Sequence, residues 1–367
     1  MSPVTPLRGR GAVSNASGRY EANRAEAFDD GWGDDGWDGD GWGEEDAKPR
    51  RLDTTLTAEA ARTILTRNDS PDIGFDRSIN PYRGCEHGCI YCYARPAHAY
   101  MDLSPGIDFE SKLFFKPNAA ELLERELSKP GYAPQKLHIG ANTDPYQPVE
   151  RRLEITRSVI AVLARFGHPF SIITKSALIV RDLDLIAPMA AQGLAKAYVS
   201  VTTLDRALAR AMEPRAATPD RRLSAIKALS GAGVPTGIGF SPVIPGLNDH
   251  EMEAVLERGA AAGATESMFI VLRLPLEIKD LFREWLEAER PDRAARVMSL
   301  VRQMRGGRDY DPQWGSRMTG QGPLAELYAR RFKLATAKHG LNRTRATLRT
   351  DLFRVPPRAG DQIELFG

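Results

Sequence analysis

The chain has 367 residues, a formal net charge of +2 and 42% hydrophobic residues, which is enough apolar surface for one large core or two ordinary ones. No stretch reaches the roughly 18 consecutive apolar residues of a membrane span, and the first residues lack the apolar stretch of a signal peptide. The composition excludes collagen-like, disulfide-rich and membrane proteins and predicts a cytoplasmic protein that does not contact a membrane.

Charge is unevenly distributed along the chain. Residues 29–46 contain nine Asp or Glu residues and no Lys or Arg, and residues 1–28 sum to +2, so residues 47–367 carry +9. A basic body of this kind suits an anionic partner such as DNA, although many enzymes have a similar excess without one.

Residues 1–50 are poor in aliphatic side chains and rich in Gly and Asp, which predicts a disordered acidic tail. A DGW triplet recurs there and places Trp32, Trp37 and Trp42 on an acidic segment. These tryptophans could occupy a basic groove in place of a nucleic acid, or they are incidental aromatics in a solvated spacer. Residues 51–77 are expected to form a lead-in segment with a short amphipathic helix over Thr54–Arg67.

From residue 78 to about 285, compact apolar runs alternate with longer stretches of helical periodicity. The predicted strands are Lys136–Gly140, Phe170–Thr174, Ala197–Thr202, Thr236–Pro242 and Met268–Leu272. The predicted helices are Ala119–Leu127, Leu153–Phe166, Leu183–Gln192, Pro219–Ala232 and Asp249–Ala262. With one more strand upstream of Cys85, these units predict an α/β fold, a partial (β/α)6 barrel of the TIM type.

The end of the chain is predicted to be a helical extension over residues 286–345 and a flexible tail over 346–367. Helical periodicity covers Glu277–Met304 and Pro323–His339. The tail contains several Arg residues and two adjacent prolines before its last apolar residues, which predicts an extended segment.

Three cysteines, Cys85, Cys89 and Cys92, lie within eight residues in the spacing C-x3-C-x2-C. They are too close together and too few for a disulfide framework. Three thiolates at this spacing fit three corners of an iron–sulfur cube, with one iron left open. A zinc site completed by His87 or His98 is the alternative, and a nucleophilic cysteine would leave two thiols without a role.

The string NPYRGCEHGCIYCYAR and the downstream GANTDPYQPVE resemble the radical S-adenosylmethionine superfamily, in the branch that contains spore photoproduct lyase. The resemblance covers about residues 78–274 and implies a [4Fe-4S] cluster on Cys85, Cys89 and Cys92. It also implies S-adenosylmethionine on the fourth iron, a 5′-deoxyadenosyl radical that abstracts hydrogen, and a reductase, ferredoxin or flavodoxin as electron donor.

The resemblance also assigns cofactor contacts at the ends of the predicted strands. Tyr91 stands where the family has an aromatic residue on the adenine side. The stretch Gly140-Ala141-Asn142-Thr143-Asp144 replaces the family's Gly-Gly-Glu, so Asn142 and Asp144 are the candidates for the methionine amino group. Further contacts are implied for Lys175, Ser200, Thr202 and Gly239.

One departure limits the likeness to the lyase. That enzyme uses an additional cysteine as hydrogen donor, and this chain has no fourth cysteine. Thymine-dimer reversal by that route is therefore not expected. Tyr93, Tyr100 or Tyr146 could replace the thiol, or each is a packing residue. The candidate catalytic residues are Tyr93, Tyr146 and Lys175.

The segment Gln362–Phe366 is similar to the bacterial sliding-clamp binding pentapeptide, Gln-aliphatic-x-Leu-Phe. A hydrophobic terminus can also fold back onto the body. The sequence thus predicts a radical enzyme acting on nucleic acid, by repair of DNA lesions or modification of bases. The alternatives are a radical enzyme acting on a small molecule or protein, and a non-enzymatic iron–sulfur adaptor.

Overall fold

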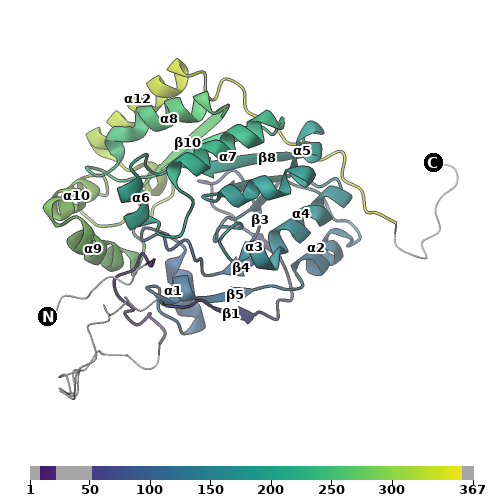
Figure 1. Cartoon of the computed structure of the whole chain (residues 1–367), viewed down its shortest axis with the longest axis horizontal. Helices are drawn as coiled ribbons and strands as arrows, with labels where there is room; N and C mark the ends of the chain where they lie inside the picture. Colours follow the sequence, from purple (N-terminus) through teal and green to yellow (C-terminus); the bar gives the residue numbers. More distant parts are fainter. Residues whose placement is uncertain (1–8, 22–51, 358–367) are drawn as a thin grey trace, which may run out of the picture.

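The computed structural model describes residues 9–21 and 52–357, and an open α/β barrel forms its centre (Figure 1). Its sheet runs in the order β10-β9-β8-β7-β6-β3-β2, and all neighbours are parallel except β2 with β3. The strands are β2 (Leu65–Arg67), β3 (Arg77–Ile79), β6 (Leu137–Ile139), β7 (Phe170–Thr174), β8 (Ala195–Ser200), β9 (Thr236–Val243) and β10 (Glu266–Val271).

These strands confirm the predicted fold class. The five predicted strands correspond to β6–β10. The bounds of β7 are as predicted, and those of the other four differ at one or both ends. Strand β3 is the expected extra strand upstream of Cys85. The residues of β7 are nearly all buried, as expected for a parallel strand with both faces covered. Edge strands β2 and β10 are not neighbours in the sheet order, so the barrel stays open on that side.

Helical crossovers cover the outer face of the sheet (Figure 1). They are α2 (Ala119–Leu127), α3 (Glu150–Leu153), α4 (Ile155–Arg165), η2 (Ala177–Asp182), α5 (Leu183–Ala191), α6 (Arg206–Met212), α7 (Pro219–Gly231), η3 (Asp249–Glu251) and α8 (Met252–Ala261). In α4, the apolar periodicity places Val159, Ile160 and Leu163 in the core. Burying each such side chain stabilises the fold by roughly 1.5–3 kcal/mol.

A second, three-stranded sheet lies beside the cysteine loop and overturns one prediction. Its order is β1-β5-β4, with β1 (Thr55–Ala58), β5 (Lys112–Phe115) and β4 (Tyr82–Arg83). The helix predicted over Thr54–Arg67 is therefore wrong, because this segment forms β1 and β2. Its threonines favour strands, and pairing of β1 with β5 outweighs the weak helical periodicity.

Within the N-terminal segment 1–50, which is predicted to be disordered, residues 9–21 form a docked N-terminal strap. Ala12 is buried, and Ser104 donates a hydrogen bond to the carbonyl of Ala16 at 2.6 Å. Low aliphatic content does not prevent docking here, because buried polar groups of the body satisfy the backbone of the strap. Residues 22–51, including the three DGW tryptophans, lie outside the described residues.

The C-terminal extension is helical, as predicted, but its first helix is divided. The helices are α9 (Ile278–Glu289), α10 (Pro291–Gln303), α11 (Ser316–Thr319) and α12 (Gly322–Lys338). Pro291 begins α10, because proline fits the first turn of a helix and ends the one before it. Tyr328 of α12 donates a hydrogen bond to Asp249 at 2.9 Å, which ties the extension to the barrel.

The prediction of a flexible tail is wrong for residues 346–357, which run along the barrel as a C-terminal strap. The backbone amides of Arg349 and Arg354 donate to the carbonyls of Gly193 and Phe166, at 2.9 and 3.0 Å. The Phe353 ring lies 5.4 Å from that of Tyr132. The clamp-like segment Gln362–Phe366 lies outside the described residues. Among the helices that the structure describes, none has the length and apolar character to cross a bilayer.

Candidate active site

The three cysteines lie on one loop that follows β4 at the carboxyl end of the barrel. Cys85 and Cys89 are each 7% exposed, Cys92 is partly buried, and all three are free thiols. The loop turns through Gly88, whose φ of 68° is unfavourable for other residues. A Cβ at Gly88 would also lie 2.8 Å from a carboxylate oxygen of Glu110. The glycine is therefore required for the loop to fold around its neighbours.

Arg95 fixes the cysteine loop from inside the protein. Its side chain is fully buried and paired with the equally buried Glu110. The other guanidinium hydrogen bonds go to the backbone carbonyls of Cys89 (2.9 Å), Gly88 (3.1 Å), Pro105 (3.0 Å) and Gly106 (2.8 Å). All five N–H donors are used, so the position of the second cysteine is set by a saturated buried network.

Glu110 also binds the N-terminal strap to this loop. Its two carboxylate oxygens accept hydrogen bonds from the amides of Gly11 and Ala12, each at 2.8 Å. An added Cβ at Gly11 would lie 1.8 Å from the carbonyl oxygen of Gly88. Ala12 belongs to the same apolar cluster as Cys89. The strap therefore covers the cysteine loop at close contact.

Gln147 connects the loop to the segment that follows β6. Its side-chain oxygen accepts a hydrogen bond from the amide of Glu86 at 2.9 Å, and its nitrogen donates to the carbonyl of Gly84 at 3.2 Å. The side chain is fully buried. Gln147 and Arg95 lie within the two strings that carry the family resemblance, but their roles depend on contacts that the spacing does not reveal.

Asp144 joins the cysteine loop to the end of β7. Its Oδ2 atom lies 3.3 Å from Nδ1 of His87, and it accepts hydrogen bonds from the hydroxyl of Thr174 and the amide of Lys175, both at 2.7 Å. Burial opposes the charged carboxylate, but His87 and these hydrogen bonds outweigh it and lower the pKa of Asp144 to about 2. Asp144 is thus an anion beside the cysteine loop.

The neighbouring candidates of this segment have simpler surroundings. Asn142 is exposed, and its backbone amide donates to the side chain of Asn80 at 2.8 Å. Gly140 has a φ of 89°, and a Cβ there would lie 2.6 Å from Pro145. The assignment of Asn142 and Asp144 to an amino group remains a prediction.

A buried network holds Tyr91 at the end of β8. The hydroxyl of Tyr91 donates to Glu213, and Thr202 donates to the same carboxylate at 2.6 Å. Glu213 is paired with buried Arg222, which also donates to the carbonyl of Ser200 at 3.1 Å. No short-range pattern in the sequence indicates Glu213 or Arg222, because each lies far along the chain from Tyr91.

Lys175 stands over this network. Its ammonium nitrogen lies 5.6 Å from the ring centroid of Tyr91, within the range of a cation–π contact. Lys175 is partly buried and forms no ion pair among the described residues. Its charge is therefore available to an anionic group at the carboxyl ends of β7 and β8.

Of two further candidates, Ser200 ends β8 and Gly239 lies within β9. The hydroxyl of Ser200 donates to the carbonyl of Ser241 at 3.3 Å. Gly239 is buried, and an added Cβ there would meet only ordinary contacts, the nearest being Met268 at 3.7 Å. The hydroxyl oxygen of Ser241 is buried and has no hydrogen-bond partner among the described residues. Such an orphaned hydroxyl fits a site that a polar ligand completes.

The two candidate tyrosines lie in different environments. Tyr93 is 48% exposed, directly follows Cys92, and donates its hydroxyl to the carbonyl of Ala141. Tyr146 is fully buried and donates to Asp182 at 3.0 Å. Exposure at the cysteine loop makes Tyr93 the more accessible of the two, and the hydrogen-donor role of each remains a prediction.

The donor set fits an iron–sulfur cube better than a zinc ion. Both histidines proposed for zinc have other partners: His87 contacts Asp144, and His98 contacts the carbonyl of Lys112 at 2.9 Å. Within residues 9–21 and 52–357, no three His, Cys, Asp or Glu side chains converge on one metal ion. Burial raises the pKa of the Cys85 and Cys89 thiols, and thiolates so placed need a nearby metal charge.

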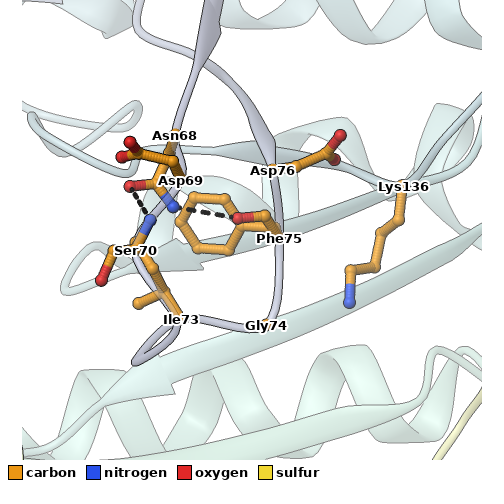
Figure 2. Close-up of a pocket in the computed structure, with 8 residues that line it drawn as sticks. All are labelled: Asn68, Asp69, Ser70, Ile73, Gly74, Phe75, Asp76 and Lys136. Carbon is orange, nitrogen blue, oxygen red and sulfur yellow. Dashed lines mark hydrogen bonds between the residues drawn. The ribbon is translucent and has the colours of Figure 1, made fainter. Parts of the chain in front are cut away.

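A surface pocket beside the barrel is separate from this site. Figure 2 shows it within the loop between β2 and β3, where Asn68 donates to the carbonyl of Phe75 at 3.1 Å. Asp76 and Lys136 of its lining precede β3 and β6. They therefore stand at the amino ends of the strands, whereas the cysteine loop follows the carboxyl end of β3.

With this geometry established, comparison with known proteins defines the class. The model of the radical SAM superfamily matches residues 79–259. The chain belongs to the radical SAM superfamily, whose members use S-adenosylmethionine and an iron–sulfur cluster.

Individual relatives are uncharacterised proteins. The chain is 39% identical to the uncharacterized protein Rv2578c of Mycobacterium tuberculosis over 230 residues, which are 62% of this chain and 68% of that protein. It is 28% identical to the uncharacterized protein MJ0683 of Methanocaldococcus jannaschii over 173 residues, 47% of this chain and 62% of that protein.

Solved structures share the fold. A mutant of spore photoproduct lyase with bound AdoMet and dinucleoside spore photoproduct superposes with a TM-score of 0.56 at 15% identity. The match covers 78% of this chain and 80% of the lyase. At this identity the likeness establishes a common fold and no common substrate.

Proposed function

We propose that this chain is a radical S-adenosylmethionine enzyme whose substrate is a base in nucleic acid. The observation that carries the proposal is the cysteine loop, in which three thiols are fixed by buried side chains to the carboxyl ends of the barrel strands. Residues at these ends form the reactive site of α/β barrels. Family membership supports the radical chemistry, and the substrate class is the finer part of the proposal.

Cys85, Cys89 and Cys92 would hold a [4Fe-4S] cluster and leave one iron for S-adenosylmethionine. When bound, the two cofactors supply a 5′-deoxyadenosyl radical that abstracts hydrogen from the substrate. Lys175 suits the carboxylate of the methionine part because its ammonium has no carboxylate partner among the described residues. Asp144 suits the amino group, since it is an anion beside the cysteine loop.

The nucleoside part of the cofactor would contact the ends of β8 and β9. Ser200, Thr202 and Tyr91 supply hydroxyl groups there, and the orphaned hydroxyl of Ser241 supports a polar ligand at this position. Glu213 and Arg222 act as positioning residues, because they hold the hydroxyls of Tyr91 and Thr202.

Nucleic acid as substrate is supported by charge. Residues 47–367 carry a net charge of +9, and positive charge attracts the phosphate backbone. The chain has no fourth cysteine, so the product radical would need a hydrogen donor other than a thiol of this chain. Tyr93 is the proposed donor, because its ring is exposed next to Cys92. A reductase, ferredoxin or flavodoxin would supply the electron.

Anaerobic reconstitution of the full chain tests the enzyme class. We expect a brown protein with about four irons per chain that forms 5′-deoxyadenosine from S-adenosylmethionine with dithionite, and we expect Cys89→Ala to lose both properties. A colourless protein with a single zinc ion would contradict the class.

The substrate class needs a separate measurement. With single-stranded and double-stranded oligodeoxynucleotides present, we expect deuterium from a labelled base to appear in 5′-deoxyadenosine. Transfer only from a small molecule or a protein would support the alternative substrates. A cluster that forms without any cleavage of S-adenosylmethionine would support a non-enzymatic adaptor.

A further inference from the structure

Arg273 is a guanidinium with few partners at the carboxyl end of β10. Among residues 9–21 and 52–357, its one hydrogen bond to a side chain goes to the thioether sulfur of Met318 at 3.5 Å, a weak acceptor. Its Nε atom is buried and has no hydrogen-bond partner among the described residues. Arg273 as a whole is partly buried. Buried polar atoms normally have a hydrogen-bond partner, so its Nε atom can take an oxygen acceptor that the described residues do not supply.

The acceptors nearest to Arg273 along the chain are already used by another arginine. Arg305 is 2% exposed and donates to the carbonyls of Leu272 at 2.7 Å and Ser316 at 2.8 Å. Arg305 therefore satisfies the backbone at the end of β10, and this pairing explains its own burial. The Nε atom of Arg305 also lacks a partner among the described residues, but Arg273 differs in that it donates to no backbone carbonyl there.

The nearby acid is also occupied. Asp72 pairs with Arg317 and accepts a hydrogen bond from the amide of Gly315 at 2.6 Å. Asp72 and Arg273 attract each other electrostatically at longer range. Among residues 9–21 and 52–357, however, no carboxylate lies within ion-pair distance of the Arg273 guanidinium. A bound oxyanion would give the guanidinium both charge and acceptors, since guanidinium groups bind phosphate in a two-point geometry.

Tyr93 places this guanidinium at the reactive end of the barrel. The Cζ atom of Arg273 lies 5.4 Å from the Tyr93 ring centroid, and the Tyr93 hydroxyl donates to the carbonyl of Ala141. Ala141 follows β6 and Arg273 follows β10, and these strands are four positions apart in the sheet. The ring therefore extends across the carboxyl ends of the strands, directly after Cys92.

The cofactor candidates Lys175, Ser200 and Thr202 lie at the carboxyl ends of β7 and β8, which stand between β6 and β10 in the sheet. An exposed aromatic ring beside an unpaired guanidinium is the combination that binds nucleotides, through stacking on the base and charge on the phosphate.

We propose that Arg273 binds a backbone phosphate of a nucleic-acid substrate, with Tyr93 as the stacking surface for an adjacent base. The inference rests on the proposed function and deepens it, because it assigns the substrate-binding side of the same site. It makes Arg273 a substrate-binding residue. The bound phosphate would lie near the cysteine loop, because Arg273 contacts the ring of Tyr93, which directly follows Cys92.

The test is the affinity of the full-length, reconstituted protein for a fluorescent single-stranded oligothymidylate, measured anaerobically by anisotropy at several salt concentrations. We expect Arg273→Gln to weaken binding by about tenfold, the loss of one charge-assisted contact. The slope of log affinity against log salt should fall by roughly 0.7, as for one single-strand phosphate contact. Arg125→Gln is the matched control, because Arg125 is exposed on the outer helix α2, and it should change affinity less than twofold.

A second probe separates the phosphate from other contacts. In an oligothymidylate with neutral methylphosphonate linkages, the wild type and Arg273→Gln should bind equally. Equal binding of the charged oligonucleotide by both proteins would overturn the proposal, and so would a loss that persists with the neutral one.

Arg273→Lys keeps the charge without the two-point geometry and should lose less affinity than Arg273→Gln. It keeps the test decisive if the Gln variant unfolds at a lower temperature. The binding assay does not use cleavage of S-adenosylmethionine. Arg273-dependent binding without 5′-deoxyadenosine formation by the wild type would therefore remove the proposed function and leave the phosphate site in place.

Discussion

Arg95 and Glu110 form an ion pair in which neither side chain is exposed to solvent. The pair holds two chain segments at once: Arg95 binds the carbonyl of Cys89, and Glu110 binds the amides of Gly11 and Ala12. The cysteine loop and the N-terminal strap are therefore fixed by one buried charge pair.

Removal of the acid of this pair should destabilise the protein strongly. We expect Glu110→Gln to lower the free energy of unfolding by about 3–5 kcal/mol, because it leaves the Arg95 cation buried without its counter-charge. Urea denaturation of the apoprotein measures this change. Glu124→Gln removes an exposed pair with Arg165 and should cost about 1 kcal/mol or less. An equal loss in the free energy of unfolding for the two variants would contradict the claim that the buried pair of Arg95 and Glu110 stabilises the protein more than an exposed pair does.

Displacement of the strap should expose the second cysteine. In Gly11→Ala the new Cβ would meet the carbonyl of Gly88, so the strap must move away from Cys89. We expect faster alkylation of Cys89 by a maleimide in the apoprotein, measured by peptide mass spectrometry. Gly74→Ala is the control, because a Cβ at Gly74 meets no atom within 4 Å. An unchanged rate in Gly11→Ala would mean that the strap does not protect the thiol.

Loss of the Gln147 side chain should impair cluster loading while the fold persists. Gln147→Ala removes the hydrogen bonds to Glu86 and Gly84, which leaves two backbone groups of the cysteine loop without partners. We expect less iron per chain after reconstitution, and a barrel that retains its circular dichroism. Gln192→Ala changes an exposed residue at the end of α5 and should load like the wild type. Full loading of Gln147→Ala would remove its positioning role.

Stability should fall as the pH decreases from about 6.5 to about 4. Burial lowers the pKa of His168 to about 4, whereas an unfolded histidine titrates near 6.5. Between these values the unfolded chain binds a proton that the folded chain does not, so acid favours unfolding. At about pH 5 this linkage costs roughly 2 kcal/mol for one such group.

The measurement compares urea denaturation of the wild type and His168→Gln at about pH 7 and pH 5. The variant should show a smaller loss of stability between the two pH values. His250→Gln changes an exposed histidine of η3 and is the control, which should lose as much stability between the two pH values as the wild type. The same pH dependence in all three proteins would exclude His168 as a contributor.

The C-terminal segment Gln362–Phe366 is proposed to bind the bacterial sliding clamp. Size-exclusion chromatography of the full chain with the clamp should give a complex that Leu365→Ala combined with Phe366→Ala abolishes. The apolar pair is the plug that such peptides insert into a pocket. The absence of a complex, or an equal shift with the double variant, would end this proposal and remove one support for delivery to DNA.

Some predictions from sequence failed because long-range contacts decided the local structure. Thr54–Arg67 has a weak helical pattern, but β1 pairs with β5 and β2 with β3. Residues 9–21 and 346–357 lack apolar periodicity, and their backbones are ordered by partners far along the chain, such as Glu110 and Gly193. Such partners cannot be identified from composition.

The spacing of Cys85, Cys89 and Cys92 and the repeated strand–helix pattern were sufficient to predict the superfamily and the barrel, because both depend on residues close together in sequence. Only the tertiary structure placed Glu110, Gln147 and Glu213 against the cysteine loop and left Arg273 without an oxygen acceptor beside Tyr93. These relationships join residues that are distant along the chain, and their energies depend on burial and on which acceptors other residues already use.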